Sequence, residues 1–138
     1  MKPMVYVGTV GVRFADLDVY GHVNVSRYLD FIVTSRWNYA QNVLKISAAD
    51  FIKKGVGIYV TSTQMSFLRS IVGLQDVVVT SQVKEINGQT MVVEFQLKNV
   101  EGSKTFCTGQ FEQKFIDLAT NKPVEPPEWV MPYHFDEV

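Results

Sequence analysis

Four side chains that could do chemistry stand close together near the start of the chain: Asp16, Asp18, His22 and Asn24. Carboxylates and imidazoles serve as general bases, nucleophiles or metal ligands. A metal site is not expected, because the spacing is generic and no further His or Cys cluster supports it; His134 lies in the tail. Aspartate is also common in turns, so composition alone favours a turn role for Asp18 and a structural or solvated role for Asp16.

Other nucleophiles carry weaker signals. Ser26 and Ser35 lack the Gly-x-Ser-x-Gly context of serine hydrolases. Cys107 lies in the middle of a predicted strand and is interpreted as a small packed hydrophobic residue. The sequence also lacks a Gly-x-x-x-x-Gly-Lys phosphate loop.

A helix predicted over residues 24–42 must position this polar segment. Asn24 is a good N-cap residue, because its side chain can accept a hydrogen bond from the first turn. Val33 and Trp37 extend the apolar surface of the helix to a second face, and such a helix tends to be buried. The residues at i, i+3, i+4 spacing that are expected to face the core are Tyr28, Phe31, Ile32, Ser35, Tyr39 and Val43.

Period-two alternation predicts a sheet around that helix. The first strand, residues 5–14, contains Gly8 and Gly11, which suggest a bulge or a close approach of two backbones. A short helix capped by Ser47 ends before Gly55. Strands joined by short turns, and therefore antiparallel, are then predicted at residues 58–68, 76–86, 91–98 and 104–118. Since only the sheet can cover the long apolar helix, we expect an α+β fold with a curved sheet wrapped around one helix.

The chain is predicted to form a single domain over residues 1–138, because this length leaves little room for a second one. A proline-rich tail is expected from about residue 122 to residue 138. Its residues 122–127, Lys-Pro-Val-Glu-Pro-Pro, are interpreted as a linker-like stretch that continues neither a strand nor a helix.

The polar segment and the start of the helix resemble the opening of hotdog-fold acyl-CoA thioesterases. The matching run is Phe-Ala-Asp-Leu-Asp-Val-Tyr-Gly-His-Val-Asn at residues 14–24, followed by Arg-Tyr-Leu-Asp-Phe at 27–31. The resemblance is to the 4-hydroxybenzoyl-CoA thioesterase group, and is closest to the bacterial long-chain acyl-CoA thioesterases. Residues 115–118, with Lys122 and Pro123, match the family's last strand and turn. The resemblance implies the hotdog fold, in which a curved antiparallel β-sheet wraps around one long central helix.

This resemblance also implies the catalytic roles. Asp18 is the expected catalytic carboxylate, as nucleophile or as general base for water, and the backbone N–H of Val25 polarises the thioester carbonyl. Asn24 caps the helix and sets where the donors point. The first N–H groups of a helix lack intrahelical partners and lie at the positive end of its dipole, so Val25, Ser26 and Arg27 are expected to offer an oxyanion site.

Three further side chains are expected near the substrate. Tyr28 is a candidate for binding the acyl group, and Arg69 is either a contact for CoA phosphates or a solvated residue at a strand end. His22 could bind substrate, orient the catalytic carboxylate or bond only to the turn backbone. The acidic pair that the family carries in its helix is replaced by Val33 and Thr34, which argues against a second catalytic carboxylate.

The function implied by the resemblance is hydrolysis of fatty or aryl acyl-CoA to a free acid and CoA, without cofactor or metal. The match to long-chain enzymes favours a medium-chain, long-chain or aryl acyl group. Two alternatives stay open. One is a non-catalytic acyl-CoA-binding hotdog protein, which the Val33 and Thr34 departure permits. The other is a hotdog hydratase or dehydratase, although the Asp-x-Asn-Pro pattern that usually precedes its His is absent.

Composition restricts the classes of partner. Thirteen Lys and Arg against fourteen Asp and Glu give a net charge of −1, which disfavours general nucleic-acid binding. No run approaches the ~20 apolar residues that span a bilayer. Residues 1–6 do not resemble a signal peptide, so a cytoplasmic location is expected. The predicted sheet has open edges, which invite pairing; together with the resemblance this implies a homodimer, as part of a dimer of dimers.

Overall fold

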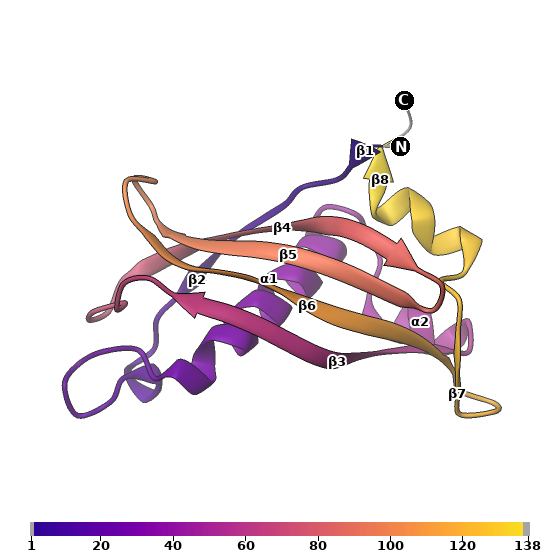
Figure 1. The fold of residues 1–138 in the computed structure, drawn as a ribbon, viewed down its shortest axis with the longest axis horizontal. Helices are drawn as coiled ribbons and strands as arrows, with labels where there is room; N and C mark the ends of the chain where they lie inside the picture. Colours follow the sequence, from indigo (N-terminus) through magenta and orange to yellow (C-terminus); the bar gives the residue numbers. More distant parts are fainter. Residues whose placement is uncertain (1, 137–138) are drawn as a thin grey trace.

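A curved antiparallel sheet and one long helix make up most of the fold (Figure 1). The computed structural model describes residues 2–136. The main sheet has the order β2-β4-β5-β6-β3, and β7 pairs with β6 beyond the end of β5. The strands are β1 (Lys2–Pro3), β2 (Tyr6–Gly11), β3 (Val56–Phe67), β4 (Asp76–Asn87), β5 (Thr90–Asn99), β6 (Thr105–Asp117), β7 (Lys122–Val124) and β8 (Phe135–Asp136).

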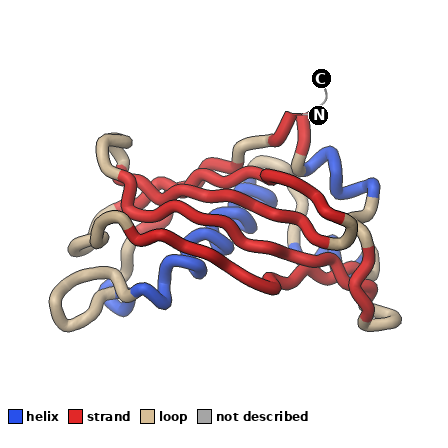
Figure 2. The backbone as a smooth tube through the Cα atoms, in the orientation of Figure 1, coloured by secondary structure: helices blue, strands red, loops and turns tan. Residues whose placement is uncertain are grey.

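The helical segments lie on one side of this sheet (Figure 2). They are α1 (Tyr28–Asn42), α2 (Ala48–Lys53) and the 3-10 turns η1 (Phe14–Asp16), η2 (Val25–Arg27) and η3 (Glu128–Tyr133). Helix α1 packs mainly against β2 and β4. Its fully buried Phe31 and Ile32 meet inward side chains of the strands, among them Val79, Leu97 and Phe111. The predicted α+β arrangement of one helix against a curved sheet is confirmed.

Two features of the predicted helix need correction. Its first turn, residues 25–27, is a 3-10 turn, and the α-helix proper begins at Tyr28. Val43 was expected in the core but is 57% exposed, because α1 ends at Asn42 and the chain turns away. Arg36, which apolar periodicity does not select, is buried instead.

The two glycines of the first strand behave differently. β2 pairs with β4 in unbroken register, so this strand has no bulge, and it ends at Gly11 rather than at residue 14. A Cβ atom at Gly8 would collide with the Ser35 Oγ of α1. The close approach predicted for Gly8 is therefore confirmed: α1 rests directly on the backbone of β2.

The later strands follow their predicted positions closely, and three register shifts bend them. The shifts lie between Val60 and Ser62 in β3, between Val83 and Glu85 in β4, and between Leu97 and Lys98 where β5 pairs with β6. Such irregularities increase the local twist of a sheet. They let the sheet curve around α1.

The interpretation of the tail as a linker is wrong for its described part. Residues 122–124 form β7, with Pro123 opposite Ile116 of β6. Proline is tolerated there because β7 is a short edge strand. The segment η3 follows, with fully buried Val130, and β8 then pairs with β1. Met1 and residues 137–138, which belong to the predicted domain and tail, lie outside the described residues.

Candidate active site

The loop between η1 and η2 is held by backbone pairing rather than by packing. The Asp18 N–H donates to the His22 carbonyl at 2.7 Å, and the Val23 N–H donates to the Ile71 carbonyl at 2.8 Å. Gly21 has a φ of 75°, a conformation that glycine adopts without strain. Its carbonyl accepts the Gly73 N–H at 2.8 Å. These bonds fix the loop against the segment that follows β3.

The Asp18 carboxylate is both a turn acceptor and an exposed acid. Its Oδ1 accepts the backbone N–H of Tyr20 at 2.8 Å and that of His22 at 3.1 Å. Within residues 2–136, no hydrogen bond reaches Oδ2. The imidazole of His22 makes no hydrogen bond within residues 2–136, whereas the backbone N–H of His22 helps to hold the Asp18 side chain in place. One carboxylate oxygen is thereby fixed while the other stays available.

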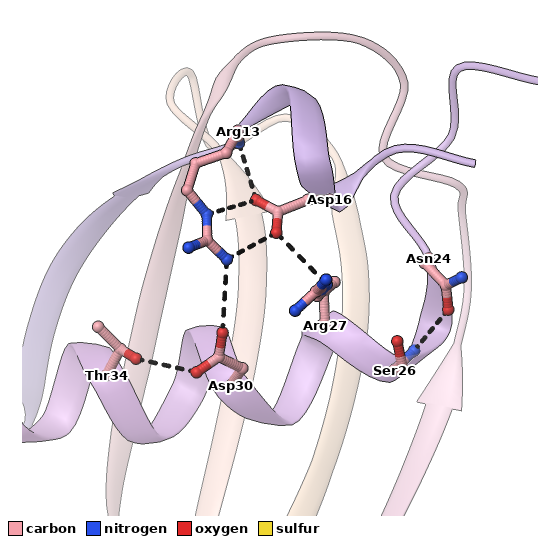
Figure 3. Close-up of polar contacts among 7 residues, drawn as sticks. All are labelled: Arg13, Asp16, Asn24, Ser26, Arg27, Asp30 and Thr34. Atoms are coloured by element: carbon pink, nitrogen blue, oxygen red, sulfur yellow. Dashed lines mark hydrogen bonds and ion pairs between the residues drawn. The ribbon is translucent and has the colours of Figure 1, made fainter. Parts of the chain in front are cut away.

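An ionic network around the buried Asp16 anchors the other end of the same loop (Figure 3). Asp16 is fully buried, and accepts the Arg13 backbone N–H at 2.8 Å and the Arg13 Nη2 at 2.8 Å. The Arg27 Nε lies 3.5 Å from the Asp16 Oδ1, which links η1 to η2. The side-chain hydrogen bond from Arg13 lowers the pKa of Asp16. The structural role expected for Asp16 is confirmed, whereas a solvated position is excluded by its burial.

Asn24 determines which N–H groups remain free at the helix start. Its Oδ1 accepts the Ser26 N–H at 3.0 Å, which confirms the predicted cap (Figure 3). Its backbone carbonyl accepts the Arg27 N–H at 2.9 Å. The prediction that Ser26 and Arg27 would be free donors is therefore wrong, because the cap and the 3-10 turn consume both groups. In the described part of the chain, the Val25 N–H makes no hydrogen bond.

The predicted site residues line one open groove of about 420 Å³ between the loop, the start of α1 and the end of β3. Tyr28 forms its buried wall and meets the Phe67 ring edge-on, with centroids 5.1 Å apart. Val25 is 58% exposed at the opening. All six candidates lie in this groove: Asp18, His22, Asn24, Val25, Tyr28 and Arg69.

Some groove residues were missed by sequence reasoning. They are Val23, Leu68 and Ser70. Phe67, which also lines the groove, is one of the side chains that the sequence offers as possible apolar lining. Leu68 and Ser70 follow the end of β3, and no periodicity in the sequence indicates that Leu68 is 56% exposed.

The groove contains no second acid in the described residues: Asp18 is its one carboxylate. Thr34, at a position of the family's acidic pair, instead donates to Asp30 at 3.3 Å. Cys107 is fully buried, as expected, and burial raises the pKa of its thiol to about 11. Across residues 2–136, no group of three or more His, Cys, Asp or Glu side chains is placed to hold a metal ion. No helix there is long and apolar enough to cross a membrane.

Comparisons with known proteins agree with this architecture. A family model described as the thioesterase-like superfamily matches residues 12–132. The long-chain acyl-CoA thioesterase FadM of Escherichia coli (strain K12) is 30% identical over 113 residues, which are 82% of this chain and 84% of that protein.

Solved structures show the same likeness. A DHNA-CoA thioesterase from Staphylococcus aureus superposes with a TM-score of 0.81 at 25% identity, covering 94% of this chain and 88% of that one. YbaW, a probable thioesterase from Escherichia coli, gives a TM-score of 0.74 at 25% identity, with 86% and 88% covered. The chain belongs to the thioesterase-like superfamily, and the predicted hotdog fold and thioester hydrolase class are confirmed.

Proposed function

We propose that the chain hydrolyses acyl-CoA thioesters with Asp18 as the catalytic carboxylate and the Val25 N–H as the oxyanion donor. The observation that carries this proposal is the free N–H of Val25 at the helix start, in the same groove as an exposed carboxylate. A helix N-terminus favours negative charge, which is what a thioester carbonyl oxygen develops on attack.

Asp18 can act on the thioester in two ways. As a general base, it takes a proton from water, the hydroxide attacks the carbonyl carbon, the C–S bond breaks, and the proton passes to the CoA thiolate. As a nucleophile, its free oxygen attacks the carbon and expels CoA, and water then hydrolyses the mixed anhydride. Both routes give the same free acid and CoA, and both need the carbonyl oxygen near the Val25 N–H.

The remaining groove residues support substrate binding in this proposal. Arg69 is exposed at the rim, where a guanidinium can pair with CoA phosphates. Tyr28 and Phe67 provide an apolar wall for the start of the acyl group. His22 lines the same groove as Asp18, and in this proposal its imidazole assists in orienting substrate.

The assignment of Asp18 is tested by measuring thiol release from a panel of acyl-CoAs. Asp18→Asn should lose most of kcat while its circular dichroism spectrum and Tm stay close to wild type. The matched control is Asp76→Asn, which neutralises an exposed aspartate outside the groove. Near-wild-type turnover by Asp18→Asn would overturn the assignment. Tight acyl-CoA binding with no turnover in the wild-type protein would instead indicate a binding protein.

We propose a medium-chain, long-chain or aryl acyl group as the substrate. The likeness to the long-chain acyl-CoA thioesterase FadM and the apolar groove wall support this choice. Each buried methylene contributes about 0.8 kcal/mol, so kcat/KM should rise with acyl length until the pocket is full. The same panel checks this, and a preference for acetyl-CoA over decanoyl-CoA and benzoyl-type thioesters would contradict it.

A further inference from the structure

A second cavity, of about 110 Å³, lies further along α1 than the proposed catalytic groove. Its walls come from β2, α1, α2, the first half of β3, β6 and the segment around η3. Most of the lining is apolar or aromatic, with Trp37, Phe51 and Phe111 among its walls. Tyr59 and Val60 of β3 are 39% and 37% exposed, so the cavity reaches the surface beside that strand.

The cation in this cavity is Arg36, whose side chain is only 8% exposed. Its Nη1 donates to the Ser81 Oγ at 2.9 Å, and its guanidinium carbon lies 4.2 Å from the centre of the Tyr6 ring. No other hydrogen bond from this side chain is formed within residues 2–136. Every side-chain nitrogen of these residues that lacks accessible surface has a partner, so the guanidinium nitrogens of Arg36 without one keep some accessible surface, and Arg36 lines the cavity.

No counter-charge balances this cation in the described part of the chain. No carboxylate there lies within 4.0 Å of Arg36. Burial raises the pKa of Tyr6 to about 12 and lowers the pKa of His134 to about 3, so both groups face Arg36 in neutral form. Burial also lowers the pKa of Arg36 to about 10, which leaves it charged at pH 7.

We propose that this cavity is an anion subsite, in which Arg36 binds a carboxylate carried on an apolar chain. A buried charge is costly unless it is paired. A guanidinium with free donors matches the two oxygens of a carboxylate, and the aromatic walls suit the attached hydrocarbon. The neutral Gln113 and His134 side chains bring no competing negative charge.

Two sources could supply such a carboxylate. One is a free fatty acid, the product class of the proposed hydrolysis. The other is the far end of an ω-carboxyacyl-CoA held in the catalytic groove. Tyr28 lines that groove and Arg36 lines the cavity. Arg36 follows Tyr28 by eight residues on α1, which corresponds to about 12 Å along the helix. A dodecanedioyl chain is long enough to cover that separation.

Binding is tested without any turnover. The chain has two tryptophans, Trp37 in the cavity wall and Trp129, so a Trp129→Phe variant reports on Trp37 alone. Dodecanoate should change its fluorescence with a Kd at least tenfold lower than that of dodecan-1-ol, because a charge-assisted hydrogen bond is stronger than one between neutral groups. Equal binding of the acid and the alcohol would overturn the proposal.

Variants made in the Trp129→Phe background test whether Arg36 is the charged group that binds the carboxylate. Arg36→Gln should remove the preference for the acid over the alcohol, and Arg36→Lys should keep part of that preference. The control variant Lys84→Gln changes an exposed strand position and should keep the whole preference. Unchanged dodecanoate binding by folded Arg36→Gln would overturn the proposal. If that variant does not fold, the comparison of acid with alcohol on the Trp129→Phe protein decides the question.

The source of the carboxylate is decided by a second arm, which rests on the proposed function. If the ligand is the far end of the substrate, dodecanedioyl-CoA should show at least tenfold higher kcat/KM than dodecanoyl-CoA in the wild-type protein but not in Arg36→Gln. Binding of dodecanoate without this gain assigns the subsite to free fatty acids. If no thioester is hydrolysed, the proposed function fails alone, because the fluorescence measurement needs no turnover.

Discussion

One side chain, Asn24, decides which backbone donor is available at the start of the long helix. Its Oδ1 accepts the Ser26 N–H and its carbonyl accepts the Arg27 N–H, so both donors are paired. The Val25 N–H has no hydrogen-bond partner within residues 2–136. The cap residue therefore leaves the Val25 N–H available for the proposed oxyanion role, where four helix N–H groups are unpaired in principle.

Val25→Pro should remove this donor while leaving the fold intact. Proline is well tolerated at the first position after a cap, and Asn24 already has the extended φ of −63° and ψ of 134° that precede a proline. Loss of one oxyanion donor typically lowers kcat about 10²–10³-fold. The measurement is kcat with decanoyl-CoA, together with Tm.

Val25→Ala is the control for that variant, because it shortens the side chain but keeps the N–H. It should retain most of the activity. A Val25→Pro protein with wild-type kcat would show that another group polarises the carbonyl.

Between elements, the Asp16 network joins parts of the chain that have few other contacts. Arg13 precedes η1, Arg27 ends η2, and Asp30 on α1 lies 3.8 Å from the Arg13 Nη2. The Asn24 N–H donates to the Asp16 carbonyl at 2.8 Å, so the network also fixes the residue that caps the helix. The position of the proposed catalytic loop thus depends on the Asp16 carboxylate, although Asp16 does not line the groove.

This network predicts a pH-dependent stability. The pKa of Asp16 is lowered in the folded protein, chiefly by the Arg13 side-chain hydrogen bond. A carboxylate with a lowered folded pKa stabilises the fold above its unfolded pKa of about 3.9, and loses that contribution as pH falls through the folded value. The Tm of the wild-type protein should therefore fall more between pH 6 and pH 3 than the Tm of Asp16→Asn.

Asp76→Asn serves as the comparison, because it removes an exposed carboxylate outside the network. It should follow the wild-type pH profile. Parallel profiles for wild type and Asp16→Asn would exclude Asp16 as the titrating group.

At the scale of the whole molecule, the main structural element that lacks a partner on one side is β3, at the open edge of the sheet. β3 pairs with β6 on one side, and its other side has no partner strand among residues 2–136. Most of its residues are exposed, including the apolar Tyr59, Val60 and Phe67. A long edge strand with exposed apolar side chains favours pairing with another chain. This strand also borders both the proposed catalytic groove and the Arg36 cavity.

We therefore expect the protein to work as a homodimer joined along β3, as part of a dimer of dimers. Light scattering at working concentration should give at least twice the monomer mass of 15.7 kDa. Ser66→Lys places a charge on this exposed strand outside the groove and the Arg36 cavity, and should shift the protein toward monomer and reduce its activity. A fully active wild-type monomer would contradict this expectation.

The local sequence determined the elements and much of the site. Ser47 with Asp50 and Asn24 with Ser26 form their caps within a few residues, so residue type and spacing were enough to predict them. Alternation of apolar and polar residues placed the four long strands, and β4, β5 and β6 bury alternate side chains in the core, whereas most of β3 is exposed. The motif around Asp18 placed five of the six candidate residues, and Arg69 was proposed from its place near the end of a strand; the structure brings all six into one groove.

Only the tertiary structure decided what depends on distant partners. Pro123 is in a strand because β6 offers an edge beyond the end of β5, which no local pattern encodes. The free state of the Val25 N–H follows from the 3-10 geometry of the turn, and the burial of Asp16 from two arginines that fold around it. In the sequence, Arg36 is a polar residue of a predicted helix. In the structure it is enclosed by three residues from distant segments, Tyr6, Ser81 and His134. Burial is a property of the assembled layers, and the sequence alone does not determine which cation they enclose.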